Sequence, residues 1–156
     1  MQKILTIIRG LPGSGKSSYA LSICEGFVSQ GIKSGICSAD DFFTVKGVYT
    51  FDGSKLAEAH ADCQRRTDLC LQAGMNVIVA NTFTCRWEMQ PYLSMAETHN
   101  ARVVVVDCFD GGMDDATLAA TNVHGVPESS IALMRGRWEH DWRAGNPIAP
   151  WLRNDR

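Results

Sequence analysis

A glycine-rich segment at residues 10–17 (GLPGSGKS) constrains this chain more than any other part of its sequence. It matches the pattern G-x-x-x-x-G-K-S/T, in which glycines let backbone N–H groups point inward around a phosphate. An apolar run at residues 4–8 precedes the segment and a helical pattern follows it. Because this strand–loop–helix context is the one that the motif requires, the segment predicts a site for the phosphates of ATP or GTP.

The side chains of this loop have separate expected roles. Lys16 supplies a positive charge for the β- and γ-phosphates, and the Ser17 hydroxyl is placed to coordinate Mg²⁺. The N-terminus of the following helix adds a partial positive charge. We therefore expect ATP and Mg²⁺ as cofactors, with the nucleotide bound by Gly10, Leu11, Pro12, Gly13, Ser14, Gly15, Lys16, Ser17 and Ser18.

Length and charge limit the other possibilities. A chain of 156 residues fits one domain, predicted over residues 1–145 and followed by a Pro-punctuated tail at 146–156. The net charge of −2 argues against broad coating of a nucleic-acid backbone. The six cysteines form no C-x-x-C pair, which indicates reduced core thiols in a cytoplasmic protein. No apolar stretch is long enough to cross a membrane, so no membrane partner is expected.

The order of apolar patterns indicates the fold class. Strand-like runs alternate with helical patterns, and the strands are nearly continuous in Val and Ile, as in a parallel sheet covered on both faces. We expect an α/β fold: a three-layer sandwich with a parallel sheet of about four or five strands and a small helical lid. The expected strands lie at 3–9, 34–39, 76–80 and 102–108, and the expected helices at 16–30, 54–73, 86–99, 113–121 and 128–142.

Polar residues follow each expected strand, where ligands bind in such sheets. Asp40 is the candidate general base, because a kinase needs a carboxylate to take the proton of the acceptor hydroxyl. The alternative is that Asp41 caps a turn and Asp40 is a solvated charge. The third expected strand ends in Ala80, which supplies no carboxylate. Either Mg²⁺ relies on Ser17, phosphate and water, with Asp40 or Asp41 acting through water, or metal binding is weakened. The expected acceptor-binding residues at these strand ends are Asp41, Asn81 and Thr82, the last two with a polar turn as the alternative.

Five segments in a fixed order carry a family resemblance. They are residues 9–17 (RGLPGSGKS), 38–43 (SADDFF), 47–52 (GVYTFD) with Ala59 and His60, 81–84 (NTFT) with 87–92 (WEMQPY), and 122–126 (NVHGV). In this order they resemble the P-loop kinase domain of the polynucleotide 5′-kinase group, especially its Nedd-binding-protein type. The resemblance covers residues 3 to about 142. It implies the P-loop NTPase/kinase fold and an ATP-dependent kinase acting on the 5′-hydroxyl of a nucleic acid, with Asp40 as general base.

Two positions depart from that family. Its members usually carry a lid arginine just before the Asn-x-His-Gly segment, where this chain has residues 119–121 (AAT). Arg135 or Arg137 could replace it, the alternative being a solvated helix face beside Glu139. The phage enzymes have a phosphate-binding arginine where this chain has Phe43, which would stack on a base or fill the core. This departure leaves an acceptor other than an ordinary DNA or RNA end open as an alternative.

Other side chains have open roles. His60 could face the acceptor or lie on a helix surface, and His124 could approach the adenine or serve a structural turn. Arg86 could hold an acceptor phosphate or be solvated. Trp87 and Tyr92 are expected in the core.

Three functions remain open at this point. The first is a kinase whose acceptor is a nucleic-acid 5′ end. The second is a kinase for a nucleoside, nucleotide or other small acceptor, favoured by the near-neutral charge and by Phe43. The third is an ATP-binding regulatory module with little turnover, favoured by Ala80 and by the absence of the lid arginine.

Overall fold

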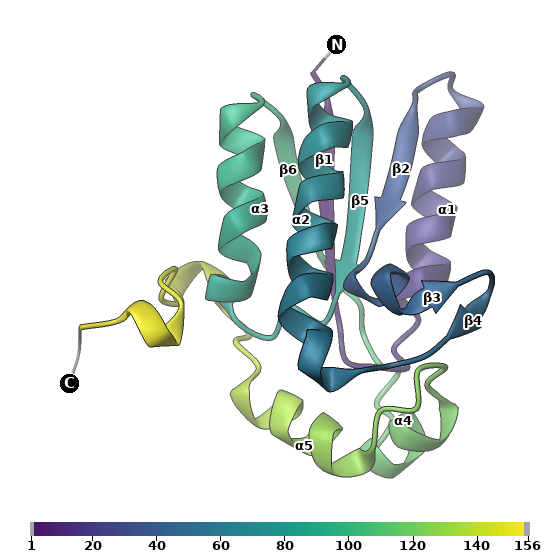
Figure 1. Ribbon diagram of the computed structural model, residues 1–156, viewed down its shortest axis with the longest axis vertical. Coiled ribbons are helices and arrows are strands. Elements are labelled where there is room, and N and C mark those ends of the chain that lie inside the picture. The colour runs from purple at the N-terminus through teal and green to yellow at the C-terminus, as the bar shows by residue number, and fades with distance from the viewer. Residues whose placement is uncertain (1, 155–156) are drawn as a thin grey trace.

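A computed structural model describes residues 2–154 of the chain. Its helices and strands follow one another as an α/β fold (Figure 1). The strands are β1 (Ile4–Arg9), β2 (Ser34–Cys37), β3 (Thr44–Val45), β4 (Val48–Tyr49), β5 (Asn76–Asn81) and β6 (Arg102–Asp107). The α-helices are α1 (Lys16–Ser29), α2 (Leu56–Gln72), α3 (Arg86–Thr98), α4 (Asp115–Thr121) and α5 (Glu128–Arg137), and short 3₁₀ helices lie at Ala39–Phe43, Gly53–Lys55, Trp142–Ala144 and Pro150–Leu152.

The main sheet has four parallel strands in the order β2-β5-β1-β6. The central strands β1 and β5 are almost entirely buried, because helices cover both faces. On one face Ile8 and Ile78 pack against Ala20 of α1; on the other, Leu5 and Val77 belong to the cluster that α2 and α3 complete. The predicted three-layer α/β sandwich with a parallel sheet is therefore confirmed.

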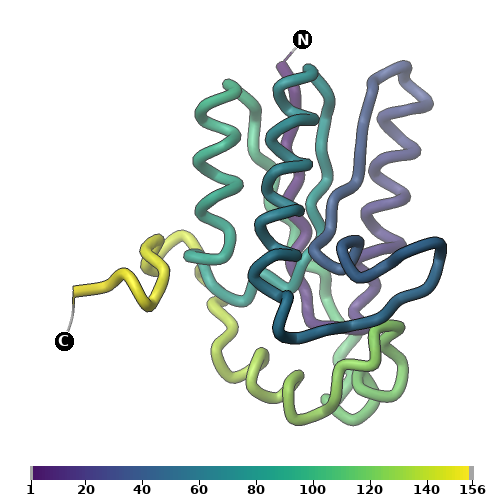
Figure 2. Tube along the Cα trace, in the orientation of Figure 1, coloured from purple at the N-terminus to yellow at the C-terminus, as the bar shows by residue number. Residues whose placement is uncertain are grey.

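The predicted small helical lid is present as well. Helices α4 and α5 lie across the carboxyl ends of the main strands, below the sheet in Figures 1 and 2. The core of the lid contains Leu118 of α4 and Ile131 of α5, and both belong to one buried cluster with Leu11 of the glycine-rich loop. The lid therefore packs directly on that loop.

The sequence analysis missed a small antiparallel hairpin, β3–β4. Its strands are only two residues each, too short for a hydrophobic alternation to appear. Lys46 and Gly47 connect them with φ of 52° and 79°. Two successive positive φ values are those of the tight hairpin turn whose twist matches that of its strands.

The last helix is shorter than expected, ending at Arg137 rather than at residue 142. The backbone of Trp138 turns to an extended conformation, and the next N–H, of Glu139, donates to the carbonyl of Thr84. This bond anchors the chain to the loop after β5, which stops the helix.

The aromatic predictions have mixed outcomes. Tyr92 is buried in the core as expected, and Phe43 is buried at 5% exposure, so it fills the core. Trp87 is only half-buried, and its ring lies 5.2 Å from that of Trp151. The expectation of a core position for Trp87 is thus wrong, since it packs against the C-terminal segment instead. The boundary predicted at residue 145 stays a prediction.

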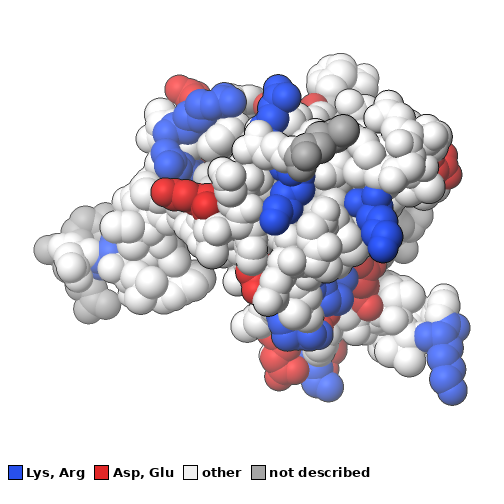
Figure 3. All heavy atoms as spheres, turned by 90° about the horizontal axis from the view of Figure 1, so that it is seen from above, with Lys and Arg blue, Asp and Glu red and all other residues white. Residues whose placement is uncertain are grey.

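The surface charges are mixed in sign where they can be seen. Figure 3 views the face that carries the amino ends of β1 and β5, opposite the lid, and shows Lys and Arg interspersed with Asp and Glu. Within residues 2–154, no helix is long and apolar enough to span a membrane.

Candidate active site

The glycine-rich loop connects β1 to α1 in a conformation that needs its glycines. Gly13 and Gly15 have φ of 83° and 95°, a region that side chains disfavour. A Cβ on Gly10 would lie 2.6 Å from the Ser14 hydroxyl oxygen and 3.1 Å from the Cys108 carbonyl oxygen, so any other residue there would force the surrounding atoms to shift. That hydroxyl oxygen is buried and has no hydrogen-bond partner among residues 2–154. Helix α1 begins with no side-chain cap, which leaves its first N–H groups for an anion. These features fit a phosphate chain.

Lys16 lies folded back over this loop. Its ammonium donates to the carbonyl oxygens of Gly10, at 2.9 Å, and Leu11, at 3.1 Å. Burial lowers the pKa of Lys16 to about 8, against the opposing influence of Cys108 and Asp40. The free loop therefore holds a lysine that loses its proton in a mildly alkaline solution.

The pKa of Lys16 leads to a prediction on nucleotide binding. The pKa in the free protein lies below the ordinary value of 10.5, and the negative phosphates of ATP favour the charged form, so binding should take up a proton above pH 8. We expect ATP affinity to fall about tenfold between pH 7.5 and pH 9, because at pH 9 roughly a tenth of the free lysine is charged. Titration calorimetry in buffers of different ionisation enthalpy measures both quantities. A Lys16→Arg variant should lose this dependence, and an unchanged affinity of the wild type across this range would contradict it.

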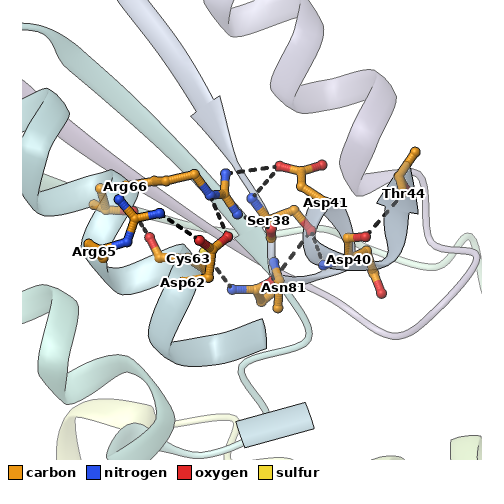
Figure 4. Close-up of polar contacts among 11 residues, drawn as sticks. Ser38, Asp40, Asp41, Thr44, Asp62, Cys63, Arg65, Arg66 and Asn81 are labelled. Carbon is orange, nitrogen blue, oxygen red and sulfur yellow. Dashed lines mark hydrogen bonds and ion pairs between the residues drawn. The ribbon is translucent and has the colours of Figure 1, made fainter. Parts of the chain in front are cut away.

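The second strand leads into a one-turn 3₁₀ helix, Ala39–Phe43, which separates the two neighbouring aspartates (Figure 4). The Ser38 hydroxyl accepts from the Asp40 N–H at 3.2 Å, and the Asp41 carboxylate accepts from the Ser38 N–H at 3.1 Å, which forms a capping box. Asp41 also pairs with Arg66 of α2 at 3.3 Å. The expected acceptor role of Asp41 is therefore corrected: its carboxylate caps the turn, which leaves Asp40 as the candidate base.

Asn81 holds this turn on the sheet (Figure 4). Its side chain is buried at the end of β5, accepts from the Ala39 N–H at 2.9 Å and donates to the Cys63 sulfur at 3.8 Å. The expected acceptor contact is corrected here too, because the amide is used to brace the backbone next to Asp40. Thr82, one residue on, accepts from the Gly10 N–H through its carbonyl at 3.2 Å and stays a predicted acceptor-binding residue.

Asp40 lies where three segments meet. Tyr49 of β4 donates its hydroxyl to Asp40 Oδ1 at 3.3 Å, and His124 Nδ1 lies 3.4 Å from Asp40 Oδ2. Burial, together with the charge of Asp40, raises the pKa of Tyr49 to about 12, so the phenol keeps its proton. The negative charge of Asp40 also acts on Lys16, where it favours the charged ammonium and so counteracts part of the pKa lowering caused by burial. His124, expected beside the nucleotide, is thus found against the candidate base.

His60 also lies within range of the charge of Asp40. It is half-buried on α2, and burial lowers its pKa, while the charges of Glu88 and Asp40 act in the opposite sense. The expected role of His60 in facing the acceptor stays a prediction.

The three candidate arginines make different contacts. Arg86 donates to the Arg143 carbonyl at 2.7 Å, so it holds the segment after α5 rather than an acceptor contact. Arg135 pairs with Asp110, in the segment before α4, and with Asp115 of α4, and its expected role in place of the lid arginine stays a prediction. Arg137 donates through Nε to the Thr84 hydroxyl at 3.0 Å, in the loop after β5. Arg137 therefore contacts the loop after β5, whereas Arg135 contacts the segment between β6 and α4.

Arg9 is a residue whose importance the sequence analysis missed. Its side chain is fully buried at the end of β1 and donates to the carbonyls of Phe83, at 2.9 Å, and Thr84, at 3.1 Å. It also pairs with Asp107 at 3.3 Å, and its guanidinium lies 4.1 Å from the ring of Trp138. The signal was present in the sequence as a charged residue that ends an otherwise apolar strand directly before the loop.

The donor set also limits how Mg²⁺ could be held. Among residues 2–154, no group of three or more His, Cys, Asp and Glu side chains could bind a metal ion. Ser17 lies exposed in the first turn of α1, next to the phosphate-binding backbone. The site therefore fits an ion carried mainly by nucleotide phosphates and the Ser17 hydroxyl.

Comparison with known proteins agrees with this geometry. A family model described as an AAA domain matches residues 5–123. NEDD4-binding protein 2 from Homo sapiens is 35% identical over 133 residues, covering 84% of this chain and 7% of the human protein. The chain thus spans only a small part of that relative's length.

Two solved structures share the fold. A chain of the Pnkp1/Rnl/Hen1 RNA repair complex matches with a TM-score of 0.64 and 18% identity, over 87% of this chain and 44% of that chain. The Mycobacterium tuberculosis APS kinase CysC in complex with AMPPNP and APS matches with a TM-score of 0.56 and 19% identity, over 69% of this chain and 63% of that chain. At these sequence identities the similarity shows a shared fold and nothing about function.

Proposed function

Because this chain belongs to the family described as an AAA domain, and is a P-loop kinase-like domain within it, we propose that it is an ATP-dependent kinase acting on a hydroxyl group. The observation that carries the proposal is the contact of Asp40 with His124, 3.4 Å away in the turn after α4, because α4 packs directly on the glycine-rich loop. A phosphate-binding loop alone would serve any nucleotide-binding protein. A carboxylate held near that loop adds a group that can take the proton of a hydroxyl acceptor.

The proposed reaction uses few groups. Lys16 and the first N–H groups of α1, which no side chain caps, would hold the phosphates of ATP, and Ser17 would hold Mg²⁺, whose charge offsets that of the phosphates. Asp40 takes the proton of the acceptor hydroxyl while the acceptor oxygen bonds to the γ-phosphorus. The bond from that phosphorus to the bridging oxygen breaks, and ADP leaves with its electron pair.

The acceptor that we propose first is the 5′-hydroxyl of a nucleic acid. The order of motifs supports it, as does the shared fold with the Pnkp1 complex, whose name refers to RNA repair. The second candidate is a small hydroxyl compound. The burial of Phe43 favours it, because no phosphate-binding side chain stands at that position.

Transfer from γ-labelled ATP to a panel of acceptors tests the proposal. The panel contains DNA and RNA oligonucleotides with 5′-hydroxyl ends, nucleosides and nucleoside monophosphates, with a Lys16→Met variant as the control for contaminating kinases. We expect label on an oligonucleotide end, with binding that weakens steeply as salt rises. Label on a small acceptor alone would move the assignment to the second candidate. ATP binding without label on any acceptor would overturn the kinase proposal and favour a regulatory module.

A further inference from the structure

The Asp40 carboxylate has two partners from separate parts of the chain. It stands on a single turn of 3₁₀ helix, and 43% of its side chain is exposed, so its local backbone alone leaves it free to rotate. Tyr49 contacts one oxygen from the β3–β4 hairpin, and His124 approaches the other from the segment after α4. The two rings contact each other, with centroids 4.5 Å apart. Together they fix the plane of the carboxylate.

The segment that carries His124 is itself held by Asn122. The Asn122 amide donates to the carbonyls of Leu118, at 2.9 Å, Ala119, at 3.2 Å, and Val126, at 3.0 Å. Its oxygen accepts from the His124 N–H at 3.2 Å and the Val126 N–H at 2.9 Å. Because one side chain closes the whole turn, the position of His124 follows that of α4.

Helix α4 in turn rests on the glycine-rich loop. Leu118 is fully buried against Leu11, and a Cβ on Gly13 would lie 3.2 Å from the Leu118 carbonyl oxygen. His124 can therefore reach Asp40 only while the lid is packed on the loop that would hold the nucleotide.

We propose that Tyr49 and His124 are positioning residues for Asp40, and that His124 makes the orientation of this base depend on docking of the lid. This inference rests on the proposed function. Tyr49 belongs to the body of the domain and His124 to the lid, so a raised lid removes one of the two contacts. The base is then held in place only when the lid covers the loop, which limits transfer to water.

Steady-state kinetics of four variants test the proposal, with the acceptor that the panel identifies. Tyr49→Phe removes only the hydroxyl, whereas His124→Leu removes the ring nitrogens together with the ring contact to Tyr49. We expect each to lower kcat roughly tenfold, with KM for ATP changed less than twofold, because the contact acts on the base and not on the phosphates. His124→Asn keeps an N–H donor near the place of Nδ1 and should retain at least half of kcat. Val123→Ala is the matched control, since Val123 is 83% exposed in the same turn.

The outcomes separate this inference from the proposed function. A wild type that transfers phosphate and a His124→Leu variant within twofold of its kcat would overturn the positioning role and leave the kinase standing. If no acceptor is phosphorylated, the kinase proposal fails. The ¹⁵N resonances of the His124 imidazole then test whether His124 contacts Asp40. The contact with Asp40 is supported if the wild-type imidazole carries its proton on Nδ1 and the Asp40→Asn variant carries it on Nε2. A proton on Nε2 in the wild type overturns the contact.

Discussion

Replacement of Asp40 by asparagine should lower the rate of phosphate transfer by a factor of about 10² to 10⁴. The amide has the shape of the carboxylate and can still accept from Tyr49, whose hydroxyl lies 3.3 Å from Oδ1, but it cannot take a proton. Affinity for ATP should stay within about threefold, because Asp40 makes no hydrogen bond to the loop among residues 2–154. Single-turnover transfer and calorimetric binding of ATP measure the two effects separately.

The neighbouring aspartate is the matched control for this prediction. Asp41 is held in the capping box and by Arg66, so Asp41→Asn should change transfer less than about threefold and lower the free energy of unfolding by about 1 kcal/mol. A large loss of transfer in Asp41→Asn, with normal transfer in Asp40→Asn, would reverse the assignment of the two residues.

Replacement of Arg9 by alanine should lower the free energy of unfolding by about 3 kcal/mol. The guanidinium is fully buried, so its loss leaves a cavity and removes the donor to the Phe83 carbonyl. The Thr84 carbonyl still accepts from the Glu139 N–H, and Asp107 is 58% exposed, so both of these groups keep a partner or water. The Phe83 backbone has a φ of 48°, a strained value for a buried aromatic residue that the Arg9 contact helps to hold.

Chemical denaturation measures this effect, and thermal denaturation should show a Tm lower by roughly 6 to 12 °C. Arg102→Ala is the control, because Arg102 lies exposed at the start of β6 and should change stability by less than about 0.5 kcal/mol. Arg9→Lys should fall between the wild type and Arg9→Ala, since an ammonium cannot bond two carbonyls and stack on Trp138 together. An Arg9→Ala variant as stable as Arg102→Ala would show that the buried contacts contribute nothing.

The strands and the loop could be predicted because their signals are local. The continuous apolar runs of β1, β5 and β6 indicate strands that are covered on both faces, and each begins and ends within one or two residues of its predicted bounds. The α5 end at Arg137 was predicted less well, because a contact with the distant Thr84 carbonyl terminates it. The β3–β4 hairpin left no periodic signal in two-residue strands.

The candidate site also contains some residues that could be predicted from the sequence and others that could not. The loop and Asp40 could be named from the sequence, but the separation of Asp40 from Asp41 depends on a single turn of 3₁₀ helix and on Arg66 from α2. Asn81 was given an acceptor role because it is a polar residue at a strand end, and Arg135 a catalytic role because it could replace the lid arginine from the next helix. The structure shows both occupied, Asn81 by the Ala39 N–H and Arg135 by Asp110 and Asp115.

The sequence by itself determined the phosphate-binding loop and the layered α/β architecture, because glycine conformations and runs of apolar residues act within a few residues of one another. Only the tertiary structure decided what surrounds Asp40. Tyr49 and His124 meet there from segments 75 residues apart, and Arg9 is buried because the loop after β5, the end of β6 and Trp138 after α5 close around it. Such contacts depend on how helices, strands and loops pack against one another. This packing brings together residues that are far apart in the sequence, and no local sequence pattern indicates their contact.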